Sequence, residues 1–283
     1  MDSIEEKRVY DDRRGALEAY VGCSVGVVRV RVAGDSVGEF GLYERCTVRD
    51  LATFDGGVAI ATDEDVRVGT PGSEAEGDDG PTFSGTGFGP AVAVGSNDGN
   101  LLAADGDGAV FRRRAGCDEW TILAAETAGA VRAIDGDLVG TDAGVYRAHD
   151  GGLDHAGLTD VRDVSAAGVP LAATDDGLYK LGNGWMVALE GPFETVGADP
   201  RTTSGRLERA HAATDEALYE HDGDDWREAD RTDAPIAGVG YGETTYVVTE
   251  DGDFRCASDD GEWRSHALGV DGVVGLAVAP ARV

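Results

Sequence analysis

One short unit recurs along the chain, and this repeat limits the fold more than any other feature of the sequence. The unit is a run of small apolar residues ending in Thr, then an acidic turn with Gly, then an aliphatic and an aromatic residue. The spacing between copies is roughly 33 to 44 residues, which is typical of repeat proteins whose units are propeller blades. The copies are Gly22–Val28, Ile60–Val66, Ala103–Phe111, Leu138–Arg147, Leu171–Lys180, Ala212–Tyr219 and Val247–Phe254.

Each copy predicts a β-hairpin. The apolar run is the second strand of a blade, the Asp/Gly pair is a tight turn in which Gly permits a positive φ, and the aliphatic–aromatic pair begins the third strand. Inner strands rich in small residues precede the hairpins. Outer strands that open on Trp follow them. The inner segments are Val131–Ile134, Val164–Ala167 and Ile236–Val239, and the tryptophans are Trp120, Trp185, Trp226 and Trp263.

The two ends of the sequence complement one another. Val273–Val278 has the pattern of an inner strand with no hairpin after it, whereas the first hairpin, near Ala19 to Val32, has no inner strand before it. We therefore expect the C-terminal strand to complete the first blade and close the ring, which removes two exposed sheet edges. The sequence predicts an all-β fold in which residues 1–283 form a single closed β-propeller of seven four-stranded blades. Six blades are the alternative if one of the degenerate early copies is misread. Residues 1–15 are an N-terminal extension, and residues 69–90 are an acidic Gly-rich insertion.

The charge of the chain is strongly negative. Asp and Glu number 54 against 24 Lys and Arg, which gives a formal charge of −30, and Lys occurs only at Lys7 and Lys180. Carboxylates dispersed over the whole chain with hardly any lysine resemble the cytoplasmic proteins of extreme halophiles, where concentrated salt screens their repulsion. An acidic surface for a cationic partner is the alternative. No apolar run is long enough to span a membrane, so we expect a cytoplasmic protein, although Arg13-Arg14 raises export as an alternative.

The segment Leu138–Gly152 resembles the Asp-box, or BNR, repeat of sialidase-type propellers and the related seven-bladed assembly-factor propellers. It departs from that box because Ala148 stands where Ser is required and no Trp follows Gly152. The resemblance covers the repeat unit along most of the chain, and it implies the fold rather than an activity. As a whole the chain resembles an uncharacterised β-propeller family of haloarchaea.

The residues do not assemble a recognisable catalytic set. The arginine cluster of sialidases cannot be placed, no nucleophile elbow or phosphate-binding loop is present, and the cysteines lack zinc spacing. Cys23 and Cys46 could form a disulfide within one blade, with free buried thiols as the other interpretation. We assign no catalytic residue, metal or cofactor. The sequence favours a non-enzymatic scaffold for protein–protein interaction, monomeric by default. The alternatives are a hydrolase or lyase acting on a carbohydrate or small ligand at the channel mouth, and a nucleic-acid-associated factor. No basic stripe suited to nucleic acid is visible.

Two charged surfaces follow from the predicted blades. The turns between second and third strands share one face, so their carboxylates should ring the channel mouth as a solvated coat, a cation site or a dock for a basic segment. This predicted acidic ring consists of Asp63, Asp105, Asp142, Asp175, Asp215 and Asp251. Arginines should gather toward the opposite face and contact a partner or an anionic ligand. These are Arg112, Arg113, Arg114, Arg201, Arg206 and Arg209.

Overall fold

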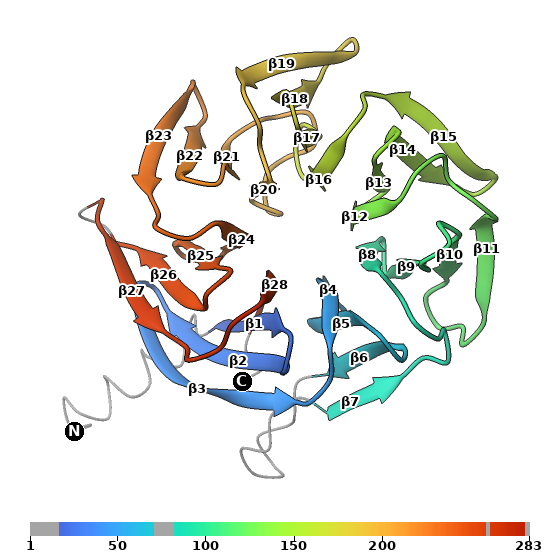
Figure 1. The fold of residues 1–283 in the computed structure, drawn as a ribbon, viewed down its shortest axis with the longest axis horizontal. Coiled ribbons are helices and arrows are strands. Elements are labelled where there is room, and N and C mark those ends of the chain that lie inside the picture. The colour runs from blue at the N-terminus through green and yellow to red at the C-terminus, as the bar shows by residue number, and fades with distance from the viewer. Residues whose placement is uncertain (1–16, 71–81, 259–260, 281–283) are drawn as a thin grey trace, which may run out of the picture.

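Seven four-stranded antiparallel sheets are arranged around a central axis in a computed structural model, which describes residues 17–70, 82–258 and 261–280 (Figure 1). The prediction of a closed seven-bladed β-propeller is confirmed. The six-bladed alternative is wrong, because all seven hairpin copies form the second and third strands of a blade.

The first four blades run as follows, each from its inner to its outer strand. Blade 1 contains β28 (Val273–Pro280), β1 (Leu17–Cys23), β2 (Gly26–Ala33) and β3 (Ser36–Glu44). Blade 2 contains β4 (Val48–Phe54), β5 (Gly57–Thr62), β6 (Val66–Thr70) and β7 (Thr82–Gly85). Blade 3 contains β8 (Ala93–Asn97), β9 (Asn100–Ala104), β10 (Val110–Arg113) and β11 (Trp120–Ala124). Blade 4 contains β12 (Val131–Asp135), β13 (Leu138–Thr141), β14 (Gly144–His149) and β15 (Gly152–Gly157).

The remaining three blades follow the same order. Blade 5 contains β16 (Val161–Ser165), β17 (Leu171–Thr174), β18 (Gly177–Leu181) and β19 (Trp185–Glu190). Blade 6 contains β20 (Thr195–Ala198), β21 (Arg209–Ala213), β22 (Ala217–Asp222) and β23 (Trp226–Arg231). Blade 7 contains β24 (Ile236–Tyr241), β25 (Thr245–Thr249), β26 (Asp253–Ala257) and β27 (Trp263–Ala267).

The ring closes through β28, as the ends of the sequence predicted. This strand pairs antiparallel with β1, from Leu17 opposite Pro280 to Cys23 opposite Val273. Closure through a strand from the other end of the sequence pairs the inner edge of β1, which would otherwise be open. The inner strand predicted at 164–167 begins earlier, at Val161, because buried Val161 pairs with Thr174 at the end of β17.

Residues 1–15 lie outside the described residues, and so do residues 71–81 of the segment predicted as an insertion. Within that segment, residues 82–85 form β7, the outer strand of blade 2. The described part of the chain contains no helix that could span a membrane.

The core lies between blades rather than within them, because each sheet is apolar on both of its faces. One cluster combines Leu102 and Val110 of blade 3 with Ile134 and Val139 of blade 4. All four tryptophans, which open outer strands, pack against such clusters. The four cysteines are free thiols.

Candidate functional site in the axial channel

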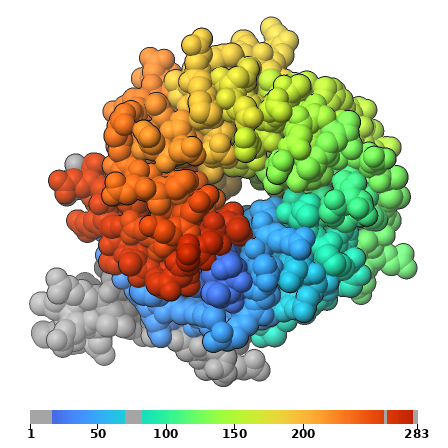
Figure 2. All heavy atoms as spheres, viewed as in Figure 1, coloured from blue at the N-terminus to red at the C-terminus, as the bar shows by residue number. Residues whose placement is uncertain are grey.

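The seven inner strands surround an axial channel with a cavity of about 820 Å³. Figure 2, viewed along the ring axis, shows the opening at its centre. Small residues such as Ala52, Ala133, Gly197, Gly238 and Gly275 line much of the wall. Inner strands converge on the axis, so small side chains let them approach without filling the channel. We call the face that bears the turns between second and third strands the upper face, and the opposite face the lower face.

A β-bulge recurs near the start of five inner strands. The pairing register shifts at the second residue of β4, β12, β16, β24 and β28. A bulge leaves one residue outside the ladder and redirects its side chain. The bulged residues are Arg49, Arg132, Arg162, Ala237 and Val274, and all five line the channel.

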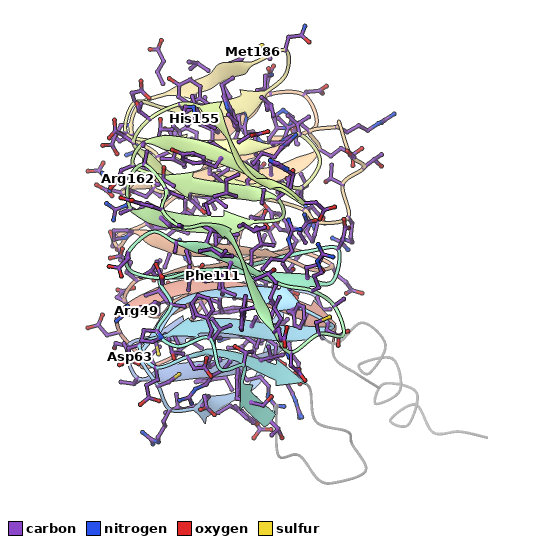
Figure 3. The ribbon with its side chains drawn as sticks, turned by 90° about the vertical axis from the view of Figure 1, so that its right-hand side faces the viewer. Arg49, Asp63, Phe111, His155, Arg162 and Met186 are labelled. Atoms are coloured by element: carbon purple, nitrogen blue, oxygen red, sulfur yellow. The ribbon has the colours of Figure 1, made fainter. Side chains whose placement is uncertain are left out.

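The rim arginines, Arg49, Arg132 and Arg162, lie at the upper mouth of the channel. Figure 3 shows Arg49 and Arg162 at the same edge of the disc as Asp63, which is in the turn after β5. Arg132 donates two hydrogen bonds to Asp142 of its own blade, from Nε to Oδ1 at 2.7 Å and from Nη2 to Oδ2 at 3.2 Å. This hydrogen bonding lowers the pKa of Asp142.

Arg162 repeats the arrangement in blade 5. Its Nε donates to Asp175 Oδ1 at 2.5 Å, and its Nη1 lies 3.7 Å from Glu194 Oε2 of the linker that leads to blade 6. Guanidinium groups recognise carboxylates well because their planar donors match the two oxygens. Two rim arginines therefore already hold carboxylates of the chain itself.

Three carboxylates, which we call the channel aspartates, stand inside the channel: Asp50, Asp135 and Asp163. Asp50 accepts the N–H of Leu51 and, from the inner strand of the next blade, that of Val94, both at 2.8 Å. Asp163 likewise accepts the N–H of Val164 at 2.8 Å and that of Val196 in the next blade at 2.9 Å.

These contacts join adjacent blades at the axis. Asp135 of blade 4 accepts the N–H of Ala166 in blade 5 at 2.8 Å, so it also joins two adjacent blades. Enclosure by the ring raises the pKa of Asp50 to about 8 and that of Asp163 to about 7, against the pull of their backbone hydrogen bonds. The same enclosure raises the pKa of Asp135. Like charges in one channel add to each shift.

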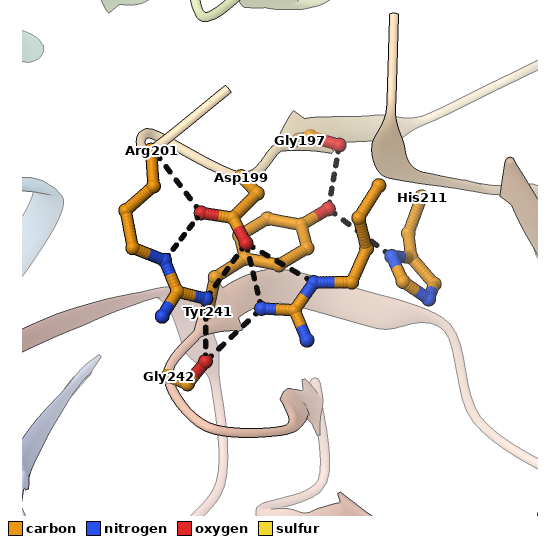
Figure 4. A network of polar contacts seen from close by, with 7 residues as sticks. Gly197, Asp199, Arg201, His211, Tyr241 and Gly242 are labelled. Atoms are coloured by element: carbon orange, nitrogen blue, oxygen red, sulfur yellow. Dashed lines mark hydrogen bonds and ion pairs between the residues drawn. The ribbon is translucent and has the colours of Figure 1, made fainter. Parts of the chain in front are cut away.

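A polar network on the lower face joins blades 6 and 7 beside the channel (Figure 4). Asp199 binds Arg201 and Arg209, with its Oδ2 at 2.7 Å from an Nη2 of each. Both arginines also donate to the carbonyl of Gly242, which lies in blade 7. Burial tends to raise the pKa of Asp199, but the hydrogen bonds from the two arginines outweigh it and lower the pKa to about 2.

Tyr241 and His211 form the buried side of this network. The Tyr241 hydroxyl donates to the carbonyl of Gly197 at 2.7 Å and lies 3.1 Å from His211 Nδ1. A phenol has one proton to donate, so Nδ1 must carry the proton of the imidazole and donate to Tyr241. Burial, with the charge of Arg209, lowers the pKa of His211 to about 3, which keeps this histidine neutral.

The sequence-predicted arginines form two separate paired groups. Arg112 is buried and binds Asp150 at 2.8 Å, while Arg113 binds Asp118 at 2.6 Å. Arg201 and Arg209 hold Asp199, as described above. Arg114 and Arg206 have only long contacts of 3.8 Å, and their side chains are 63% and 72% exposed. A binding role for the group stays a prediction, and these two are its most accessible members.

The predicted acidic ring has mixed roles. All six aspartates lie in turns that follow second strands. Asp142 and Asp175 bind rim arginines, Asp105 accepts backbone N–H groups of its own turn, and Asp251 accepts a hydrogen bond from Thr249. Within the described residues no group of His, Cys, Asp and Glu could hold a metal ion.

Sequence reasoning missed the rim arginines and the channel aspartates, although a signal for them exists. The inner strands repeat Val-Arg followed by Asp or Ala and an aliphatic residue, at 48–51, 131–134 and 161–164. Regular strand alternation would not place the Arg at the mouth, because the bulge that does so depends on how the ladder pairs.

Fold and site together define a seven-bladed β-propeller with a polar axial channel and a rim of arginines. A family model described as "Beta-prop_HVO_0234-like, beta propeller" matches residues 3–279. The chain belongs to that HVO_0234-like β-propeller family.

Solved structures show the same fold at low sequence identity. The WD40 β-propeller domain of Doa1 is 16% identical with a TM-score of 0.63, covering 83% of this chain and 90% of its own. A chain of the nidogen/laminin complex is 9% identical with a TM-score of 0.59, covering 94% and 100%. YCF48 bound to D1 peptide is 14% identical with a TM-score of 0.55, covering 84% and 94%. A search of curated proteins found no match.

Proposed function

We propose that this propeller is a non-enzymatic interaction scaffold that binds a protein partner in the cytoplasm of an extreme halophile. The observation that carries the proposal is the upper mouth, where bulges on three inner strands present arginines around a polar channel. Pockets for small molecules are mostly apolar and enclosed, whereas an open mouth lined by charge suits a segment of another protein.

The likeness to other propellers supports this proposal. One of the similar structures is a complex between YCF48 and a peptide, and another is a complex between nidogen and laminin. A propeller is rigid because its ring is closed, so it can bind a partner without ordering its own backbone. The same fold also hosts enzymes, and for that reason the proposal rests on the mouth rather than on the fold.

The lower-face arginines are proposed as a second contact surface. Arg114 and Arg206 are exposed and only weakly paired, whereas Arg201 and Arg209 hold the Asp199 network together. Reversing the charge of Arg114 and Arg206 should therefore weaken a partner bound there without disturbing the fold. Unchanged binding after R114E and R206E would remove this surface from the proposal.

A pull-down from native cells in molar salt, with identification by mass spectrometry, tests the scaffold directly. The expected result is one protein recovered in stoichiometric yield with the chain as bait. A second acidic halophilic protein of similar charge is the control bait, because it captures proteins that bind carboxylate surfaces in general. Recovery of no stoichiometric partner, or of the same proteins on both baits, would contradict the proposal.

A further inference from the structure

Two arginines of the upper face differ in their ion pairing from all others that the structure describes. Every other described arginine forms an ion pair with a carboxylate of the chain. Among the described residues, Arg45 and Arg49 alone have no carboxylate partner, and both are exposed. They lie four positions apart, in the linker from β3 to β4 and in the bulge of β4.

The other rim arginines show what Arg49 would bind. Arg132 and Arg162 occupy the same bulge position on their inner strands, and each holds a carboxylate from the next turn of its own blade. The corresponding residue in blade 2 is Asp63, which also follows the Thr that ends the second strand. No ion pair joins Arg49 to Asp63.

The turn of blade 2 explains this difference. It contains three residues, 63–65, between β5 and β6, whereas the turns of blades 4 and 5 contain two. The other two carboxylates of this longer turn bind groups other than Arg49. Asp65 accepts the N–H groups of Gly87, Phe88 and Gly89, and Glu64 binds Arg67 at 2.7 Å. The site that holds an internal carboxylate in blades 4 and 5 is thus left open in blade 2.

Apolar side chains lie on the other side of Arg49. Val274 occupies the equivalent bulge of the adjacent inner strand β28, lines the same channel and is 40% exposed. Val25, in the turn between β1 and β2, is 50% exposed. That turn lies beside the start of β28, because Ser24 N donates to the carbonyl of Gly272 at 3.2 Å. The upper mouth therefore has a basic side on blade 2 and an apolar side on blade 1.

We infer that Arg45 and Arg49 bind a carboxylate on a peptide segment of the partner, and that Val25 and Val274 contact an apolar side chain of the same segment. The inference rests on the proposed scaffold function and names the chemistry of its partner. A carboxylate is the complement that all other described arginines have, and a single short segment adds little to the repulsion from a chain of net charge −30. A polyanion such as nucleic acid would meet that repulsion along its whole length.

Panning a peptide display library against the protein in molar KCl tests the inference. We expect enriched peptides to share an Asp, a Glu or a free C-terminal carboxylate next to an apolar residue. Replacing that carboxylate by the amide should abolish most of the binding. The double variant R45Q/R49Q should weaken binding by about tenfold or more, the loss expected for a charge-assisted contact.

The matched control is R227Q/R231Q, which removes the same charge from the outer strand β23. It should bind like the wild type. Because Arg45 and Arg49 form no ion pair, their double variant should also keep the wild-type melting temperature, so lost binding would not reflect lost folding.

Several outcomes would overturn the inference. These are enriched peptides without a carboxylate, binding that R45Q/R49Q leaves unchanged, and arginine-dependent binding of an oligonucleotide in place of a peptide. If the pull-down recovers a partner whose binding ignores R45Q/R49Q, this inference fails while the scaffold proposal stands. If neither experiment yields a binder, both fail.

Discussion

Tyr241 of blade 7 is a single polar residue whose hydroxyl contacts two groups of blade 6. Its hydroxyl pairs with the Gly197 carbonyl of blade 6 and the neutral imidazole of His211, and Arg209 lies over its ring with the guanidinium carbon 5.3 Å from the centroid. Burial raises the pKa of Tyr241, so the phenol stays protonated and keeps donating. One hydroxyl thereby joins two blades at the channel wall.

Tyr241→Phe should lower the free energy of unfolding by about 1–3 kcal/mol, because it leaves the Gly197 carbonyl and His211 Nδ1 without their partner. Chemical denaturation monitored by tryptophan fluorescence measures the loss. Tyr179→Phe is the control, since that hydroxyl contacts only the exposed carboxylate of Asp176. Equal stability of the two variants would contradict the role assigned to Tyr241.

The channel aspartates predict a dependence of stability on pH. A carboxyl whose pKa is raised on folding favours the folded state at low pH, and this contribution is lost as pH rises through the folded pKa. With Asp50 at about 8 and Asp163 at about 7, the melting temperature should fall from about pH 4 to about pH 8 and level off above that.

The double variant D50N/D163N tests this dependence. Its melting temperature should change less with pH over that range than that of the wild type. Asp215→Asn, on the exposed turn after β21, should leave the wild-type slope unchanged. A wild-type melting temperature that is flat or rises with pH would show that these carboxyls are not perturbed as described.

At the residue scale the sequence predicts positions better than partners. The turn carboxylates lie where the repeat places them, because the turn follows from Asp and Gly in a fixed pattern. The pairing of Asp199 with Arg201 and Arg209 was not predictable. It depends on the loop between β20 and β21 of blade 6, whose arginines contact the carbonyl of Gly242 in blade 7. Among the described residues, Arg49 has no carboxylate partner because the turn between β5 and β6 is one residue longer than the corresponding turns of blades 4 and 5.

At the scale of the strands, close approach of inner strands at the axis decides which residues are allowed. A Cβ on Gly238 of β24 would lie 2.6 Å from the backbone nitrogen of Leu276 in β28. This contact is with backbone, which cannot move as a side chain can. The small residues of the inner strands, which were predicted from the repeat, are therefore required by the distance between blades 7 and 1.

Gly238→Ala should accordingly destabilise the ring by about 1–3 kcal/mol through overpacking. Gly41→Ala on the outer strand β3 is the control, because the nearest atom to its Cβ would be 3.9 Å away. Thermal unfolding of both variants measures the difference. If Gly238→Ala matched the stability of Gly41→Ala, the blades would be more loosely packed at the axis than the structure indicates.

Most strands were predictable because the repeat combines alternating apolar residues with turn residues at fixed positions. The bulges were not. A bulge changes the register by one residue and requires no particular residue type. A charged residue, Arg49, and an apolar one, Val274, can therefore occupy the same position. β7 was also missed, because Thr82–Gly85 follows an acidic Gly-rich segment rather than the Trp that opens other outer strands.

At the scale of the whole molecule, the charge of −30 governs how the ring behaves in salt. In dilute buffer the Debye length is about 30 Å at 0.01 M salt, so carboxylates repel one another across much of the disc. The halophilic interpretation predicts that the melting temperature rises steeply from dilute buffer to molar KCl. Sucrose, which stabilises folded proteins without screening charge, should give a much smaller rise. Equal effects of KCl and sucrose would contradict this interpretation.

The upper mouth of this propeller is proposed to bind a carboxylate-bearing segment of a protein partner. A crystal structure of the chain with the partner recovered from native cells tests it most directly. We expect a partner carboxylate within hydrogen-bonding distance of the Arg49 guanidinium and an apolar partner side chain against Val274. A partner seated on the outer strands or the lower face, with Arg45 and Arg49 still in solvent, would contradict it.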